Sequence, residues 1–174
     1  MIRISYNPTI NDFIEFNLYH HWYSPDKRKF RNTLILKVAL WVMSPIIFYC
    51  FFILNPVTDD IRFPLLVGFS IAAISSSVYY LTYKVNLRSN CVRFYSNPLN
   101  SAFLEETYVE IENNVLKINQ KSYLMEIPIS SFVKITENNG SYYLYTNSMQ
   151  ALIIPRRAFE NSELNISFRK ALNL

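Results

Sequence analysis

The chain has 174 residues and a formal net charge of +4, and 51% of its residues are hydrophobic. Its charges are unevenly spread: residues 1–104 carry ten Lys and Arg against five Asp and Glu, whereas residues 105–174 carry seven against eight. The basic excess therefore lies outside the part that looks globular, which argues against the basic folded face of a nucleic-acid-binding protein. Cys50 falls in one long apolar stretch and Cys91 follows another, so the two are expected to lie too far apart to pair, and they form no disulfide framework.

The N-terminal segment, residues 1–31, combines a short strand with an aromatic helix. Ile2–Tyr6 alternates apolar and polar residues, which predicts a strand and a candidate extra edge for a sheet elsewhere in the chain. Thr9 and Asp12 are spaced as in a capping box and predict a helix over residues 10–23. That helix is amphipathic, and two placements stay open: in a membrane interface, or against the C-terminal domain.

Two apolar stretches dominate residues 32–83. Leu34–Leu54 and Pro64–Tyr83 are each about 20 residues long, the length that a helix needs to cross a bilayer. Only Lys37 interrupts them with a charge, and it lies in the first turn of its stretch. The pattern predicts an integral membrane α-helical hairpin.

Charges that flank the two stretches predict its orientation. The connecting loop carries Asp59 and Asp60, whereas basic residues gather at the other ends of both stretches. By the positive-inside rule, both termini are cytoplasmic in a multi-pass protein of a cell membrane. Contacts with anionic lipid headgroups are therefore expected from Lys27, Arg28, Lys29, Arg31, Lys84 and Arg88.

Small residues recur every four positions in the second stretch. Gly68, Ala72 and Ser76 would lie on one face of a helix and allow another helix to pack closely. Packing between the two spans of one hairpin is the favoured interpretation, and a seam with another chain stays open as the second.

Residues 84–104 are expected to continue the second helix and to end in a linker, and residues 105–174 then form a small α+β domain. Asn113-Asn114 and Asn139-Gly140 are hairpin-turn sequences, and residues 161–172 have a helical apolar period. The expected architecture is an antiparallel sheet closed by a C-terminal helix. Its strands are predicted over residues 107–111, 115–119, 123–127, 132–137, 142–146 and 151–154.

Signals of catalysis or cofactor binding are nearly absent. Glycine occurs only at positions 68 and 140, so no glycine-rich phosphate loop exists. The pair His20-His21 lacks spaced partners for a metal, and no histidine follows it. We therefore expect no catalytic, metal or cofactor site. Arg156-Arg157 is the candidate contact for a phosphate or for a carboxylate-bearing partner; the alternatives are a solvated corner, or an Arg packed on an aromatic ring.

Three local strings carry a family resemblance. They are Ile127–Phe132 (IPISSF), Tyr142–Tyr145 (YYLY) and Ile153–Phe159 (IIPRRAF), and with two apolar spans before them the chain resembles the bacterial YcxB-like family. The resemblance implies a pleckstrin-homology-like partial barrel and a place in the bacterial inner membrane, and it implies no catalytic residues. The chain departs from the family where a Pro-Trp-Ser/Thr-Asp/Glu-Ile pattern is common, because it has Ile129 and Ser131 at the Trp and acidic positions.

The expected function is a membrane-anchored, non-catalytic binding module that holds a small β domain at the cytoplasmic face for a protein partner. Basic residues in the first hairpin loop would indicate inositol phosphate binding, but that loop reads Glu112-Asn113-Asn114. The alternative is an accessory subunit of a larger membrane complex or transporter, packed through the second span. A membrane enzyme is a distant third.

Overall fold

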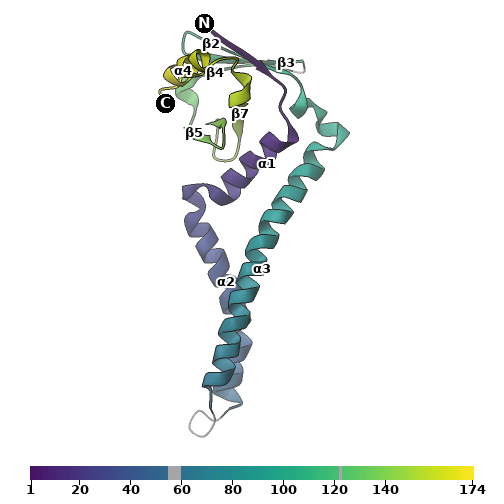
Figure 1. The fold of residues 1–174 in the computed structure, drawn as a ribbon, viewed down its shortest axis with the longest axis vertical. Coiled ribbons are helices and arrows are strands. Elements are labelled where there is room, and N and C mark those ends of the chain that lie inside the picture. Colours follow the sequence, from purple (N-terminus) through teal and green to yellow (C-terminus); the bar gives the residue numbers. More distant parts are fainter. Residues whose placement is uncertain (55–59, 122) are drawn as a thin grey trace. The chain divides into compact units, whose positions relative to one another are not determined.

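The structure is a computed structural model that describes residues 1–54, 60–121 and 123–174. The chain divides into two compact units (Figure 1). Residues 1–20 and 89–174 form the first, here called the sheet unit, and residues 21–88 form the second, the hairpin unit. Both ends of the chain therefore belong to one unit, and each unit is described by itself.

Two long apolar helices make up the hairpin unit. Helix α2, Arg28–Phe52, follows a short 3₁₀ turn, Pro25–Lys27, and helix α3 spans Arg62–Tyr95, its last turns belonging to the sheet unit. Both are long and apolar enough to cross a membrane. The predicted apolar helices are confirmed, although the predicted connecting loop lies largely at residues 55–59, outside the described residues.

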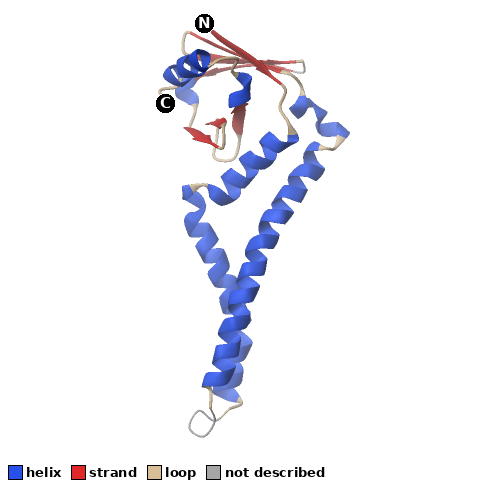
Figure 2. Ribbon diagram, in the orientation of Figure 1, coloured by secondary structure: helices blue, strands red, loops and turns tan. Residues whose placement is uncertain are grey.

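Four antiparallel strands form the first sheet of the sheet unit (Figure 2). They are β1, Ile2–Tyr6; β2, Thr107–Glu112; β3, Val115–Gln120; and β4, Tyr123–Pro128, in the spatial order β1-β2-β3-β4. The first strand pairs with the second over their whole lengths, so the predicted N-terminal edge strand is confirmed.

Three further antiparallel strands form a second sheet in the order β5-β6-β7. They are β5, Lys134–Asn138; β6, Ser141–Tyr145; and β7, Ala151–Pro155. Both predicted asparagine turns have positive φ at their two central residues: 48° and 61° at residues 113 and 114, and 46° and 73° at residues 139 and 140. This is the backbone of type I′ hairpins, which asparagine and glycine tolerate.

The expected single sheet, partly closed into a barrel, is not what the described residues form. They make two separate sheets, and neither is closed. The break falls at Pro128, which has no N–H to give to a ladder, and at the 3₁₀ turn Ile129–Ser131 that follows it. Helix α4, Ser162–Ala171, packs Phe168 into the core between the sheets, as the predicted C-terminal helix should.

Helix α1, Ile10–Leu18, covers the second sheet. Its Phe16 packs against the ring of Tyr143 with centroids 5.2 Å apart, and Tyr19 packs against the same ring at 5.4 Å. Thr9 and the third helical residue, Asp12, form the predicted capping box. Two placements were open for this helix, and residues 10–20 lie against the C-terminal domain. A π-helical turn, Tyr19–Tyr23, follows and crosses the boundary between the two units in the sequence.

Candidate functional site

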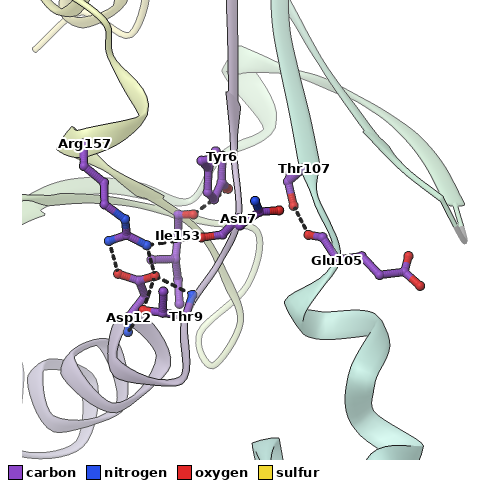
Figure 3. Close-up of polar contacts among 8 residues, drawn as sticks. All are labelled: Tyr6, Asn7, Thr9, Asp12, Glu105, Thr107, Ile153 and Arg157. Atoms are coloured by element: carbon purple, nitrogen blue, oxygen red, sulfur yellow. Dashed lines mark hydrogen bonds and ion pairs between the residues drawn. The ribbon is translucent and has the colours of Figure 1, made fainter.

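The predicted arginine corner is occupied by carboxylates of the same unit. Arg157 donates two hydrogen bonds to the carboxylate of Asp12, at 2.6 and 2.5 Å, and one to the carbonyl of Asn7 at 3.3 Å (Figure 3). Arg156 forms an ion pair with Glu137. The bidentate pairing of Arg157 with Asp12 fixes this guanidinium in place. It also occupies the pair of N–H donors that would best bind a phosphate or carboxylate. The corner is therefore better suited to holding the fold together than to contacting a partner.

Asp12 is held in its charged form by its neighbours. Burial alone would raise the pKa of this carboxyl, but hydrogen bonds from Arg157 and Thr9 outweigh burial and lower the pKa below its usual range. The Thr9 backbone N–H donates to the carboxylate at 2.7 Å. One carboxylate thus caps α1 and anchors the segment that follows β7.

The small-residue stripe faces the other helix of the hairpin unit. Gly68 and Ala72 are buried, and a Cβ added to Gly68 would lie 2.9 Å from Ile46 Cδ1 and 3.2 Å from Met43 Sδ. Ser76 is half-buried on the same face, one turn further along. The close approach matches the favoured interpretation, packing within one hairpin.

The predicted lipid-contact residues fall into two groups. Arg28, Lys29 and Arg88 are exposed, and Lys27 is half-buried in the 3₁₀ turn before α2. Arg31 and Lys84 are instead built into an aromatic cluster: Arg31 Nη1 donates to the Trp22 and Ser24 carbonyls, and Lys84 Nζ lies 4.5 Å from the centroid of the Tyr80 ring. The second group is thus held in place by contacts with carbonyls and aromatic rings.

Strand β4 stands out because both of its faces are open. Tyr123, Leu124 and Met125 are 43%, 68% and 45% exposed, whereas each other described strand has at least one buried or half-buried face. Among the described residues β4 pairs only with β3, so its other edge offers unpaired backbone groups. An exposed apolar edge is one that proteins usually blunt or cover, because it readily pairs with another strand.

A groove of about 480 Å³ lies beside β4 within the sheet unit; we call it the β4 groove. One side is the β3–β4 face, and the others come from α1, the end of α3, the 3₁₀ segment Pro98–Leu104 and β7 with the turn before it. Its volume is within the range of sites that hold small or extended ligands. Its principal apolar lining residues are Phe13, Phe16, Phe94, Tyr95, Phe103, Ile118, Met125, Ile127, Met149, Leu152 and Ile153.

Several polar groups of the groove are already hydrogen-bonded to the fold. The Tyr6 hydroxyl donates to the Ile153 carbonyl at 2.6 Å and so joins β1 to β7 (Figure 3). Gln120 donates to the Thr107 hydroxyl at 2.5 Å, and that hydroxyl donates to the Glu105 carbonyl at 3.1 Å. With these groups engaged, recognition in the groove depends on shape and apolar contact.

Sequence reasoning did not find the β4 groove. It arises from segments at residues 6–17, 94–103, 107–127 and 146–153, which no local pattern connects. The available signal was the composition of Tyr123–Ile127, where four of five residues are apolar although the strand lies at a sheet edge.

Comparison with known families identifies the C-terminal part of the chain. A family model described as YcxB-like protein matches residues 111–172, from the end of β2 to the end of α4. Residues 111–172 are therefore similar to a YcxB-like domain. The resemblance predicted from the three local strings is therefore confirmed. Neither the comparison with curated proteins nor that with solved structures finds a match.

The match leaves out the first elements of the sheet unit. Strand β1 and helix α1 precede it by some hundred residues in the chain, yet they pair with β2 and cover the second sheet. In this protein the YcxB-like domain is thus completed by the N-terminal segment.

Breaking the Asp12–Arg157 pair should destabilise the sheet unit in a pH-dependent way. We expect Asp12→Asn to cost about 2 kcal/mol at pH 7, the scale of charged hydrogen bonds. Since the folded pKa of Asp12 lies below the unfolded value of about 3.9, this contribution is complete above that value. It is lost as pH falls below about 4 and through the folded pKa, so wild type and variant should converge at acidic pH. Pulse proteolysis of the full chain in urea and mild detergent measures the difference.

A surface pair gives the control for that measurement. Glu110→Gln removes an ion pair with Arg3, whose side chain is 70% exposed, and should change stability by less than about 1 kcal/mol. An Asp12→Asn cost that is as large at the lowest pH as at pH 7 would contradict the assigned role of the carboxylate.

Enlarging Gly68 should open the hairpin. Leucine at this position would overlap Ile46 and Met43, and overpacking of this kind typically costs about 1–3 kcal/mol. We expect Gly68→Leu to raise the rate at which N-ethylmaleimide alkylates Cys50, a buried α2 residue, in detergent and in a Cys91→Ser background. Phe69→Leu, at an exposed neighbour, is the control. An unchanged Cys50 rate together with loss of a larger complex would make the stripe an intermolecular seam.

Proposed function

We propose that this protein is a membrane-anchored, non-catalytic binding module whose β4 edge binds an extended peptide segment of a partner protein. The observation that carries the proposal is the apolar β4 strand, open on both faces and along one edge beside the β4 groove. This choice replaces the Arg156-Arg157 corner as the candidate contact, because both guanidiniums have carboxylate partners within the sheet unit.

Membrane anchoring is supported by the surfaces of α2 and α3. Only 11% of the most apolar window in each helix is buried within the protein, unlike the core helix of a water-soluble domain. Trp41 is 82% exposed and Phe69 is 66% exposed. An apolar surface of this extent is unfavourable in water and matches a hydrocarbon environment.

Orientation in the bacterial inner membrane follows from the charges already described. Basic residues gather around the start of α2 and toward the end of α3, which favours cytoplasmic termini and a sheet unit on that side. Asp60 and Arg62 are the charged residues of the opposite end that the structure describes, and Asp59 lies outside the described residues.

Peptide binding by strand addition would use the two features of β4 together. The free edge supplies backbone N–H and C=O groups to an added strand, and these give affinity largely independent of sequence. Alternate side chains of the added strand would then enter the β4 groove, where Met125 and Ile127 lie on its wall. Because the lining is mainly apolar, the partner segment should carry apolar residues at alternate positions.

The pleckstrin-homology-like interpretation belongs with this proposal. Two antiparallel sheets and a C-terminal helix around a shared core are the elements that it requires. The first hairpin of the YcxB-like match turns at Asn113 and Asn114, without a basic residue. The domain is therefore proposed as a platform for a protein rather than for an inositol phosphate.

The alternative function, an accessory subunit that packs through α3, has less support. Its proposed seam, the stripe of Gly68 and Ala72, packs against Met43 and Ile46 of the same chain. Such a subunit would need a different face of α3, one where exposed apolar residues contact lipid as readily as another protein.

A peptide-library selection tests the proposal directly. Displayed peptides are selected on the full chain in lipid nanodiscs, and enrichment of apolar residues at alternate positions is expected. Met125→Lys should weaken the selected peptide's binding at least tenfold by placing a charge on the wall of the β4 groove. Val133→Lys is the matched control, since Val133 is 71% exposed in the same unit but does not line the groove.

Two results would contradict the proposal. One is an equal loss of binding in the Met125→Lys and Val133→Lys variants, which would indicate a general effect of charge. The other is photo-crosslinking of a partner from lipid-facing positions of α3, such as Phe69, with none from Leu124; this would favour the accessory-subunit alternative.

A further inference from the structure

We propose that the partner segment bound at the β4 edge carries a lysine or arginine between two apolar residues, placed beside Glu126. This inference rests on the strand addition proposed above and goes beyond it, because the β4 groove predicts only the apolar positions of the partner. It concerns the face of the first sheet that bears the side chains of Arg3, Glu110, Lys117 and Glu126; we call it the outer face.

Only alternate residues of β4 can form backbone hydrogen bonds with an added strand. At the end of the β3–β4 ladder, the Ile129 N–H donates to the Asn114 carbonyl at 2.9 Å, which sets the phase of the hydrogen bonds. Because bonded pairs alternate along an antiparallel ladder, Leu124 and Glu126 direct their N–H and C=O groups away from β3. Pro128 adds a carbonyl on that side but has no N–H. An added strand is therefore centred on Leu124 and Glu126.

A row of alternating charges crosses the outer face and ends at this edge. Arg3 of β1 pairs with Glu110 of β2, and their side chains form an ion pair at 3.1 Å. Glu110 pairs in turn with Lys117 of β3, and Lys117 with Glu126 of β4. Residues paired directly across a ladder have their side chains on the same face. The charges thus run positive, negative, positive, negative from β1 to the open edge.

Glu126 is the member of the row whose charge has no ion pair among the described residues. The ammonium group of its neighbour Lys117 lies 3.3 Å from the carboxylate of Glu112. The Glu126 side chain is exposed, so a new strand can reach it. Along the described strands the outer face carries two bases and three acids: Arg3, Lys117, Glu110, Glu112 and Glu126. A cation on a fifth strand would continue the alternation and neutralise the excess acid.

The residues on either side of that cation would face the β4 groove. Side chains alternate between the two faces of a strand, so these neighbours lie beside Met125 and Ile127, which line the groove. Apolar side chains are favoured there. The residue two positions from the cation lies beside Leu124, which is 68% exposed, and an apolar side chain would cover it. The expected signature is therefore apolar, basic, apolar.

A separate partner fits this edge better than a second copy of the chain does. The signature also occurs in β1, as Ile2-Arg3-Ile4. That strand is paired with β2 over its whole length, and its Arg3 already forms an ion pair with Glu110. Strand β1 also packs against the 3₁₀ turn Arg156–Ala158 and against α4 of its own unit. Its pairing and its charge are thus satisfied within one chain.

The peptide selection described above tests the inference once its sequences are aligned on their apolar positions. Lysine or arginine should be enriched at one fixed position between two apolar residues. Binding is then measured at low salt with the full chain in phosphatidylcholine nanodiscs, whose lipids do not attract a basic peptide. Replacing the base of the selected peptide with Glu should weaken binding on the order of tenfold, because lost attraction and new repulsion each contribute about threefold.

Charge reversal in the chain should invert this preference. Glu126→Lys should bind the Glu form of the peptide on the order of tenfold more tightly than the basic form, by the same two contributions. This rescue separates the charge effect from a loss of folding. Glu163→Lys is the matched control, since Glu163 is an exposed acid of α4 and should leave the wild-type preference unchanged.

Four results would overturn the inference. Equal binding of both peptide forms to wild type, with Met125→Lys still weakening both, would remove the basic position and leave strand addition intact. Equal effects of Glu126→Lys and Glu163→Lys would indicate a general effect of charge. Failure to select any peptide would overturn strand addition and this inference with it. Self-association of the full chain in detergent that Glu126→Lys abolishes would assign the edge to a second copy.

Discussion

Pairing between the first six residues and a strand that begins a hundred residues later is the constraint on which the rest of the fold depends. Ile2 pairs with Ile111 and Tyr6 with Thr107, so the sheet unit is assembled from both ends of the chain. The Tyr6 hydroxyl then joins β1 to β7, and Arg157 holds the start of α1 through Asp12. Residues 21–88, the hairpin unit, are therefore an insertion in the sequence of the sheet unit.

Assembly of the sheet unit from both ends of the chain determines which of its surfaces stay open. Strand β1 occupies one edge of the first sheet, and α1 covers the rings of Tyr143 and Tyr145 on the second. Within the described residues, strand β4 receives no comparable cover, and Pro128 with the following 3₁₀ turn prevents the ladder from continuing into β5. The free edge and the β4 groove are therefore consequences of how the chain is joined, and the proposed strand addition rests on both of them.

Local sequence predicted the elements well because local physics determines them. The predicted strands end within two residues of the observed ones, and the Asn113-Asn114 and Asn139-Gly140 turns have the expected positive φ. Alternation, β-branched residues and turn chemistry suffice for that. The close packing at Gly68 and Ala72 was likewise predicted, because small side chains every four residues in an apolar helix indicate a face where another helix packs closely.

The parts that were not predicted depend on contacts between distant residues. Arg157 and Asp12 lie 145 positions apart, and nothing in either neighbourhood indicates the other. Division into two sheets depends on a single interruption at Pro128, which a strand-by-strand pattern does not weigh. The basic flank could be predicted from the sequence. The contacts of Arg31 with the Trp22 carbonyl and of Lys84 with the Tyr80 ring could not, because these residues come from separate segments.

Hydrogen–deuterium exchange of the full chain in lipid nanodiscs tests the central claim, that the β4 edge is open and accepts a strand. Without peptide, β4 amides that face away from β3 should exchange much faster than the paired amides of β3. With a saturating selected peptide, new protection should appear at residues 123–127 and leave β1 unchanged. Full protection of β4 without any peptide, or new protection confined to another element, would contradict the account.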